Sequence, residues 1–294
     1  MTISSIIVNY NSGEFLRESV NSLLNYVGDV EIIVVDNKST DESLDSILFD
    51  PQIKIIHNNS NLGFAVACNI GTKIATGSHL LYLNPDCEFK PPALDKLLGI
   101  LNSDQSVGMV GGLILNSDGS EQAGARRAIP TPWRSFVRAF GLAKLSKRWP
   151  RLFFDFHLHK QPIPTLPIEV EAISGACMLV KREAITDVGL WDEGYFLHCE
   201  DLDWCMRFRL KGWKILFVPD AVVHHAKGIS SSGRPVFVEW HKHRGMIRFY
   251  RKFFQHQYPF GLMSLVWLGV WIRFAALAFA LTAKRLLTPK AKSE

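Results

Sequence analysis

The sequence has few cysteines and lacks several short motifs that would identify its chemistry directly. Its five cysteines are scattered over 294 residues and form no CxxC pair, which argues against a disulfide framework or a zinc site. No GxGxxG follows the first predicted strand and no GxxxxGK(S/T) occurs, which disfavours the dinucleotide-binding and P-loop classes. We therefore expect a protein of a reducing compartment whose ligand site is built in another way.

Acidic residues are absent between Glu121 and Asp155, whereas basic residues recur throughout this stretch. The formal net charge of the chain is +5. Such a cluster indicates an anionic partner, either phosphate, a lipid headgroup or nucleic acid, although a solvated basic surface would look the same. No recognition element for DNA or RNA accompanies it, so we expect no nucleic-acid partner. Residues 123–167 are also rich in aromatic residues and proline, which predicts a mobile segment over the sheet.

A basic leader is also lacking, because Met1 runs directly into an apolar strand pattern. We therefore expect no secretory signal and a catalytic part that stays in the cytosol. With 47% hydrophobic and 21% charged residues, the chain can bury the core of one sizeable domain or two small ones.

Short β-branched runs alternate with helix-period segments in the first hundred residues. Parallel neighbouring strands need a crossover, usually a helix, so this alternation predicts an α/β fold with βαβ units. The predicted strands are 3–8, 31–35, 54–56, 79–83, 107–115, 172–180 and 214–218. The predicted helices start near Asp41 and Pro91, and further helices cover 202–211 and 241–252.

Polar residues follow the predicted strands where ligands of open α/β sheets bind. They are Asn9, Tyr10 and Asn11 after the first strand, Asp36 and Asn37 after the second, and Asn84 and Asp86 after the fourth. Each alone could be an ordinary cap or turn residue. Together, the two carboxylates offer one acceptor for a base or ribose and one hard oxygen ligand for Mg²⁺ or Mn²⁺.

Several motifs in order resemble glycosyltransferase family 2. The runs VNYNS, VVDNKSTDES, NLGFAVACNIG and LNPD are similar to its donor half, and SGACMLVKREA and GLWDEGYFLHCEDLDWCMR are similar to its acceptor half. The resemblance covers about residues 3–250. It implies a GT-A type fold, with a mixed, mainly parallel sheet flanked by helices. It further implies a donor-binding half (1–115), an acceptor-binding and catalytic half (116–257) and a C-terminal apolar helical segment (258–294).

By this resemblance, Asp36 recognises the base or ribose, and Asp86 is the last carboxylate of the family's metal-binding DxD element. This chain departs from that pattern with Asn84 at the first acidic position. Asn9 and Asn69 are implied to shape the nucleotide pocket. The full set expected to bind the nucleotide sugar is Asn9, Tyr10, Asn11, Asp36, Asn37, Asn61, Asn69, Asn84 and Asp86.

In the acceptor half, the resemblance assigns Asp201 as the base that accepts the acceptor hydroxyl proton, with Glu200 orienting the acceptor or a loop. Helix capping could alternatively explain some acids of this cluster, which includes Asp203. Direct attack implies inversion at the anomeric carbon. Residues expected to contact the acceptor are Trp191, Asp192 and Glu193. His225, favoured over His224 by its spacing to Gly228 and Ser230, is expected to complete the metal site with Asp86.

Residues 259–283 contain a single charge, Arg273, and are long enough to span a bilayer. An arginine near the middle makes insertion costly by roughly 2.5–3.5 kcal/mol. We therefore expect a helix lying in the membrane surface, with a buried helix or a dimer contact as the alternative. Residues 241–252 supply basic side chains that could bind diphosphate or lipid headgroups, or be an ordinary wet helix face.

These features together predict an inverting, metal-dependent sugar transferase of cell-surface glycan synthesis at the cytoplasmic face of the inner membrane. The expected partners are a nucleotide diphosphate sugar (dTDP-rhamnose or a UDP-sugar), a lipid-linked glycan acceptor, the membrane surface and a second copy in a homodimer. The motif style is most similar to rhamnosyltransferase members. Competing hypotheses are a nucleotidyltransferase and a non-catalytic nucleotide-binding membrane scaffold.

Overall fold

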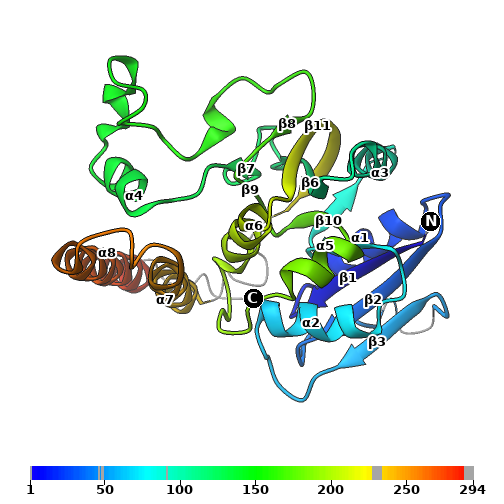
Figure 1. The fold of residues 1–294 in the computed structure, drawn as a ribbon. Helices are drawn as coiled ribbons and strands as arrows, with labels where there is room; N and C mark the ends of the chain where they lie inside the picture. Colours follow the sequence, from blue (N-terminus) through cyan, green and yellow to red (C-terminus); the bar gives the residue numbers. More distant parts are fainter. Residues whose placement is uncertain (1, 46, 48–49, 91, 227–233, 288–294) are drawn as a thin grey trace.

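A nine-stranded sheet forms the centre of the molecule. The computed structural model describes residues 2–45, 47, 50–90, 92–226 and 234–287 (Figure 1). The strand order is β3-β2-β1-β4-β10-β6-β11-β5, with β8 paired to β11, and β7 and β9 form a separate small sheet. The strands are β1 (Ile3–Asn9), β2 (Val30–Asp36), β3 (Ile53–His57), β4 (His79–Leu83), β5 (Cys87–Phe89), β6 (Val107–Leu115), β7 (Arg126–Arg127), β8 (Ile168–Glu169), β9 (Ala172–Ile173), β10 (Cys177–Lys181) and β11 (Lys214–His225).

The sheet is mixed. Strand β1 pairs in parallel with β2 and β4, and β2 pairs in parallel with β3. Strand β10 then enters antiparallel between β4 and β6, while β11 runs parallel to β6 and antiparallel to β5. Because β1, β2 and β4 share one direction, the polar residues that follow them meet at one edge of the sheet. The predicted α/β class and mixed sheet are confirmed.

Helices cover both faces of the sheet. Along β1, Ile3 and Ile7 pack with α1 and α3, whereas Ile6 and Val8 pack with α2, α5 and α6. This alternation follows from the two-residue period of a strand. The helices are α1 (Phe15–Leu24), α2 (Phe64–Ile74), α3 (Ala93–Ser103), α4 (Pro132–Ala139), α5 (Arg182–Val188), α6 (Glu200–Leu210), α7 (Pro235–Phe253) and α8 (Phe260–Leu287), with short 3-10 turns η1 (Leu142–Lys147) and η2 (Leu158–Lys160).

Three predicted elements differ from the structure. The described residues after Asp41 form turns instead of a helix, because Ser39 bonds back to Asp36 and does not cap forward. The strand predicted at 172–180 is interrupted at 174–176, which separates β9 from β10. The segment 123–167 holds β7, α4, η1 and η2, so it is more structured than its composition indicated. Pro91 lies outside the described residues.

The C-terminal apolar helix is confirmed as α8, which lies beside α7 (Figure 1). Within the described residues, Gly261–Leu287 is the single helix long and apolar enough to cross a membrane, and only 6% of its most apolar window is buried. Trp271 contacts Trp240 of α7 with ring centroids 5.0 Å apart, and the Arg251 guanidinium lies 4.4 Å from the Trp267 ring. Residues 288–294 are outside the described part.

Candidate active site

The ends of β1 and β2 hold one buried carboxylate. Asn9 and Asp36 are register partners, and Asp36 is only 3% exposed. Its Oδ1 accepts hydrogen bonds from Asn9 Nδ2 (2.9 Å) and Ser39 Oγ (2.6 Å), and its Oδ2 accepts one from the Ser39 backbone N–H (3.1 Å). The carboxylate is therefore held in one orientation at the sheet edge, as a group that recognises a ligand requires.

The neighbouring asparagines shape the loops around Asp36. Asn37 is buried and donates to Gly63 O (3.2 Å), and Asn61 Oδ1 accepts from the Gly63 N–H (3.0 Å). Asn11 has a left-handed backbone with φ 51°, and its Oδ1 accepts from the Thr40 N–H (2.7 Å). Tyr10 is partly exposed beside them. The structure thus brings the predicted strand-end residues to one edge of the sheet.

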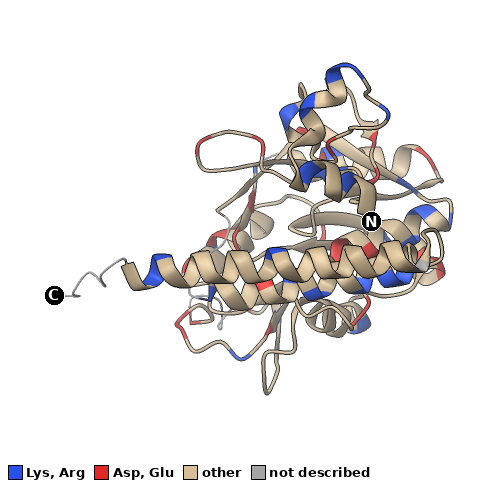
Figure 2. Cartoon of the chain, turned by 90° about the vertical axis from the view of Figure 1, so that its left-hand side faces the viewer, with Lys and Arg blue, Asp and Glu red and all other residues tan. Residues whose placement is uncertain are grey.

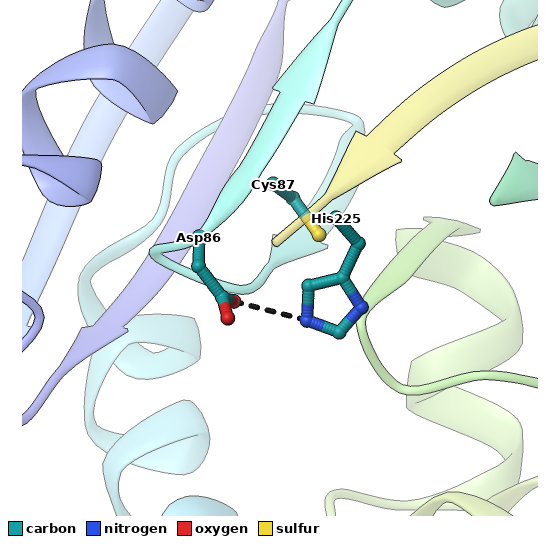
Figure 3. A group of neighbouring side chains, drawn as sticks. All are labelled: Asp86, Cys87 and His225. Carbon is teal, nitrogen blue, oxygen red and sulfur yellow. Dashed lines mark ion pairs between the residues drawn. The ribbon is translucent and has the colours of Figure 1, made fainter. Parts of the chain in front are cut away.

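A second carboxylate, Asp86, faces a histidine across the sheet edge. The His225 Nε2 atom lies 3.0 Å from Asp86 Oδ1, and both side chains are largely buried (Figure 3). Pairing of β11 with β5 places His225 opposite Cys87, next to Asp86 in the chain. Asn84 is nearby, with its Nδ2 3.4 Å from the same imidazole nitrogen.

The tautomer of His225 is set by a chain of amides. Gln122 Nε2 donates to Asn116 Oδ1 (3.1 Å), which leaves Gln122 Oε1 to accept from His225 Nδ1 at 2.7 Å. In the neutral ring, the Nε2 lone pair is therefore directed at the Asp86 carboxylate. Two acceptors 3.0 Å apart require a proton or a cation between them. These residues fit a divalent metal, for which a carboxylate oxygen and a neutral imidazole are ordinary ligands.

The other two candidates near this pair are less suitable as ligands. Cys87 Sγ lies within the same group, but it donates to Ala176 O (3.4 Å) and burial raises the pKa of its thiol well above the usual range. His224 precedes His225 on β11 and is not one of the residues whose ligand atoms lie close together. Both histidines line a pocket of about 270 Å³ with Asp86. Gly228 and Ser230 lie outside the described residues.

The acidic pair Glu200 and Asp201 begins α6 after a strained turn. His198 and Cys199 have φ values of 67° and 73°, a left-handed conformation that is costly for residues other than glycine. Helix α7 packs against this turn, since a Cβ at Gly245 would come within 2.8 Å of His198 O. Packing therefore holds the strained conformation that presents the acids.

Asp201 is paired with a cation that the sequence did not single out. Its Oδ2 forms an ion pair with the Arg127 guanidinium and accepts from the Gly175 N–H (3.2 Å). Both charged side chains remain partly accessible, at 18% for Arg127 and 14% for Asp201. Nothing in the sequence distinguishes Arg127 from the other basic residues of the stretch to which it belongs. Only the pairing of β7 with β9 identifies it as the one that faces α6.

Glu200 points the other way, into the protein. It is 7% exposed and its Oε2 has no hydrogen-bond partner among the described residues. Burial, together with the negative charge of Asp201, raises the pKa of the Glu200 carboxyl to about 8. The two adjacent acids therefore differ in state, with Asp201 charge-paired and Glu200 protonated at neutral pH.

The three-residue turn 174–176 connects the Asp86–His225 pair to the Glu200–Asp201 pair. The Asn84 N–H donates to Ala176 O (2.9 Å), and the Gly175 N–H donates to Asp201 Oδ2 (3.2 Å). A Cβ at Gly175 would lie 3.2 Å from Asp201 Cβ, so the glycine permits this approach. Asp86, two residues beyond Asn84, and Asp201 thus flank the same segment 174–176, which is the interruption between β9 and β10.

Two residues expected to contact ligands are instead part of the core. Trp191 is 2% exposed and packs against Trp204 with ring centroids 4.1 Å apart, so its side chain is not placed to touch an acceptor. Asn69 is also 2% exposed, and its side chain bonds the Trp191 backbone (2.9 and 3.0 Å) and Glu193 Oε1 (2.9 Å). Asn69 therefore braces the 189–195 loop against α2, which differs from the expected place in the nucleotide pocket.

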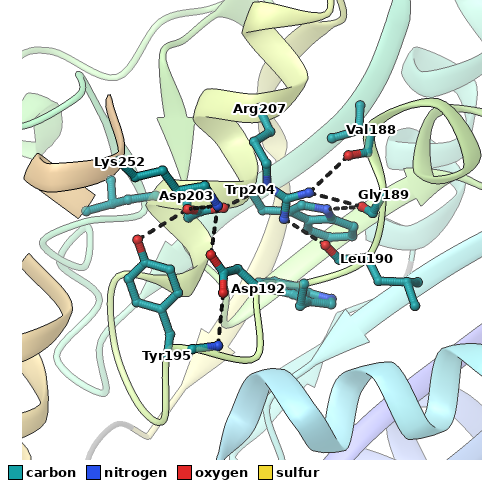
Figure 4. A network of polar contacts seen from close by, with 12 residues as sticks. Val188, Gly189, Leu190, Asp192, Tyr195, Asp203, Trp204, Arg207 and Lys252 are labelled. Carbon is teal, nitrogen blue, oxygen red and sulfur yellow. Dashed lines mark hydrogen bonds and ion pairs between the residues drawn. The ribbon is translucent and has the colours of Figure 1, made fainter. Parts of the chain in front are cut away.

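Asp192 of this loop and Asp203 of α6 form a network with α7 (Figure 4). The Lys252 ammonium lies 2.7 Å from Asp192 Oδ2 and 2.7 Å from Asp203 Oδ2. Although burial opposes it, hydrogen bonds from Lys252 and Arg248 lower the pKa of Asp192 to about 2. Asp203 also accepts from Arg207 Nε (2.7 Å). The acids of the 189–195 loop and of α6 thus include members of structural ion pairs as well as the catalytic candidates.

Much of the basic stretch is likewise neutralised internally. Arg126 pairs with Glu121, Arg127 with Asp201, Arg134 with Glu171 and Arg138 with Asp155. Gln122, at the start of this stretch, orients His225, and no sequence pattern indicated this role. The expected anionic partner therefore concerns only the later basic residues.

Comparisons with known proteins identify the family of this chain. The sequence profile Glycosyl transferase family 2 matches residues 4–189. The chain belongs to glycosyltransferase family 2. A second profile, Glycosyl transferase family group 2, matches residues 143–287 of this glycosyltransferase. An N-acetylglucosaminyl-diphospho-decaprenol L-rhamnosyltransferase of Mycobacterium tuberculosis is 30% identical over 243 residues, which are 78% of this chain and 78% of the relative.

Solved structures resemble this glycosyltransferase in fold. GalNAc-T7 with UDP, GalNAc and Mn²⁺ has a TM-score of 0.57 and 21% identity, covering 76% of this chain and 44% of that chain. A mannosyltransferase of Pyrobaculum calidifontis in complex with GDP-Man and Mn²⁺ has a TM-score of 0.57 and 16% identity, covering 99% of this chain and 76% of that chain. The expected GT-A fold is confirmed.

Proposed function

We propose that this glycosyltransferase moves a sugar from a nucleotide diphosphate donor to a lipid-linked glycan acceptor, with inversion of the anomeric carbon. The observation that carries the proposal is the 174–176 turn, which joins the Asp86–His225 pair to Asp201. The relative from Mycobacterium tuberculosis supports a lipid-linked acceptor and rhamnose as the sugar to test first. A dTDP-rhamnose or UDP-sugar donor, a homodimer and a position at the cytoplasmic face of the inner membrane remain our proposals.

On the donor side, Asp36 is proposed to accept hydrogen bonds from the base or ribose, because Asn9 and Ser39 already fix its orientation. Asp86 and His225 are proposed to hold a divalent metal. A bound divalent ion supplies charge stabilisation for the leaving diphosphate. A ligand set of imidazole and carboxylate favours Mn²⁺ over Mg²⁺, which prefers oxygen ligands alone.

On the acceptor side, Asp201 is proposed to accept the proton of the attacking hydroxyl. The acceptor oxygen forms a bond to the anomeric carbon while the bond from that carbon to the diphosphate oxygen breaks, and the nucleoside diphosphate leaves. Arg127 pairs with this carboxylate and holds it in position. Glu200, being protonated, supports α6 from inside and does not compete as a base.

The division into a donor half (1–115), an acceptor half (116–257) and a membrane-associated segment (258–294) also stays a proposal. The metal-type pair crosses the first boundary, because Asp86 comes from the donor half and His225 from the acceptor half. The site therefore forms only where the two halves pack against each other.

A donor panel with a matched variant tests the proposal. Purified protein is heated with individual nucleotide sugars, with and without Mn²⁺, because a donor at about 100 times its Kd stabilises by about 2.7 kcal/mol. Replacing Asp201→Asn is expected to lower kcat by about 10²–10⁴-fold while donor stabilisation persists. Asp187→Asn, at an exposed site of α5, serves as control. Sugar transfer by Asp201→Asn at the parent rate would refute the base assignment.

A further inference from the structure

The segment 131–153, which we call the aromatic arm, exposes large apolar side chains on one surface. Trp133 and Phe136 of α4 stack with centroids 5.5 Å apart, and Phe140 continues the row 4.5 Å from Phe136. Their spacing of three and four residues places them on one face of the helix, and Val137 beside this face is buried. The exposed fractions are 43% for Trp133, 44% for Phe136, 67% for Phe140, 46% for Trp149 and 56% for Leu152.

The same arm also carries exposed basic residues. No acid occurs between residues 131 and 153. Unlike Arg134 and Arg138, the four later basic residues form no ion pair within the described part of the chain, and all four are exposed. They are Lys144, Lys147, Arg148 and Arg151. Aromatic side chains beside unpaired cations suit the interface of an anionic membrane, where rings lie at headgroup depth.

The arm and α8 lie on the same side of the molecule. Figure 1 shows both on the left, and both face the viewer after the turn of Figure 2. Tyr250 Oη of α7 and Ser135 Oγ of α4 are 2.7 Å apart, so the arm is bonded to the helix on which α8 packs. Basic side chains of the arm and the apolar length of α8 therefore belong to one face.

Packing on α7 decides how α8 meets a membrane. One face of α8 contacts α7 or the core beside it through Met263, Val266, Trp267, Val270, Trp271 and Phe274. The opposite face exposes Leu262, Leu265, Leu268 and Ile272. The contacts reach at least Phe274, so at most residues 275–287 continue beyond them. They rise about 20 Å as a helix, which is short of a bilayer core of about 30 Å. The helix is thus placed to lie along the surface.

We propose that the aromatic arm is a second membrane contact, which docks together with α8, in the plane of an anionic phospholipid surface. This inference goes beyond the proposed reaction and does not depend on the donor or acceptor. Two contacts on one face fix the orientation of the protein on the membrane, which a single in-plane helix would leave free to roll.

Vesicle sedimentation of the full chain tests the charge component. Vesicles of phosphatidylcholine alone are compared with vesicles that also contain phosphatidylglycerol. Each basic residue near an anionic surface contributes roughly fivefold in affinity, so the variant with all four residues replaced by glutamine is expected to bind anionic vesicles roughly 600-fold more weakly. Its binding to neutral vesicles should not change. The variant is Lys144→Gln, Lys147→Gln, Arg148→Gln and Arg151→Gln.

A control with the same change in net charge removes lysines of β3, α2, α3 and the end of α6, namely Lys54→Gln, Lys73→Gln, Lys96→Gln and Lys211→Gln. Affinity of the control for anionic vesicles should stay within about threefold of the parent, since short-range attraction falls off within a Debye length of about 10 Å. Equal losses in both variants would show a general charge effect and overturn the proposal.

Spin labels test the aromatic component directly. All five native cysteines are buried, so a single surface cysteine can be labelled. A label at Phe140→Cys is expected to move into lipid on vesicle binding, measured by increased collision with oxygen and protection from a water-soluble nickel complex. A label at Val27→Cys, in the turn between α1 and β2, should stay aqueous. An aqueous Phe140→Cys label on vesicle-bound protein would show that α8 alone makes the contact.

Discussion

Replacing Glu200 with glutamine is expected to change how the stability of the protein depends on pH. The Glu200 carboxyl is buried beside Asp201, and its Oε2 lacks a partner within the described residues. Burial and the neighbouring negative charge raise its pKa to about 8 from an ordinary value of 4.5. Glutamine keeps the shape of the side chain and has no proton to lose.

The sign follows from proton binding in the two states. Below pH 4.5 the group is protonated in both the folded and the unfolded chain, so it does not affect the pH dependence. Between that pH and about 8 the unfolded chain releases the proton while the folded protein keeps it. The free energy of unfolding contributed by Glu200 therefore falls by about 1.4 kcal/mol per pH unit as the pH rises.

Urea unfolding from about pH 5 to about pH 8 measures this slope. The stability difference between Glu200→Gln and the parent should grow with pH in favour of the variant and level off near pH 8, the folded-state pKa. Glu42→Gln, at an exposed carboxyl, should run parallel to the parent. Parallel curves for Glu200→Gln as well would mean that the buried carboxyl ionises freely in the folded protein, and the assignment of a neutral Glu200 would be abandoned.

Three further changes probe the site. His225→Ala should weaken the apparent affinity for Mn²⁺ at least about tenfold, measured by thermal stabilisation with Mn²⁺ alone. An unchanged Mn²⁺ titration would show that His225 is not a metal ligand. Arg127→Ala should lower kcat about tenfold or more and Arg127→Lys less, since an ammonium can pair with Asp201 without the forked geometry; steady-state rates decide this. Asn69→Ala should cost about 1–3 kcal/mol in urea unfolding, against little for exposed Asn25→Ala. Equal effects of the two would show that the brace is not needed.

The regular core of the fold could be predicted from the sequence because its signals are local. Strands such as His79–Leu83 and Val107–Leu115 were predicted with the observed bounds, since apolar runs between turn residues determine them. The polar strand ends Asn9 and Asp36 meet as expected, because neighbouring parallel strands end together.

Contacts between distant segments could not be predicted in this way. Arg127 faces Asp201 only because β7 pairs with β9, and each of these strands has two residues. Gln122 orients His225 across 103 positions of sequence. Trp191 was expected to contact the acceptor, whereas its ring packs against the aromatic rings of Tyr82 and Trp204. Such packing has no periodic signature in the chain.

The ammonium of Lys252 has a consequence for how the protein is handled in the laboratory. It sits on the helix that carries α8 and bonds Asp192 and Asp203 in the loop and helix of the acceptor half. A reagent that separates α8 from α7, such as a detergent micelle, is expected to disturb these two ion pairs. Acceptor turnover should then deteriorate while donor affinity survives, so extracts with intact nucleotide binding can still be poor catalysts.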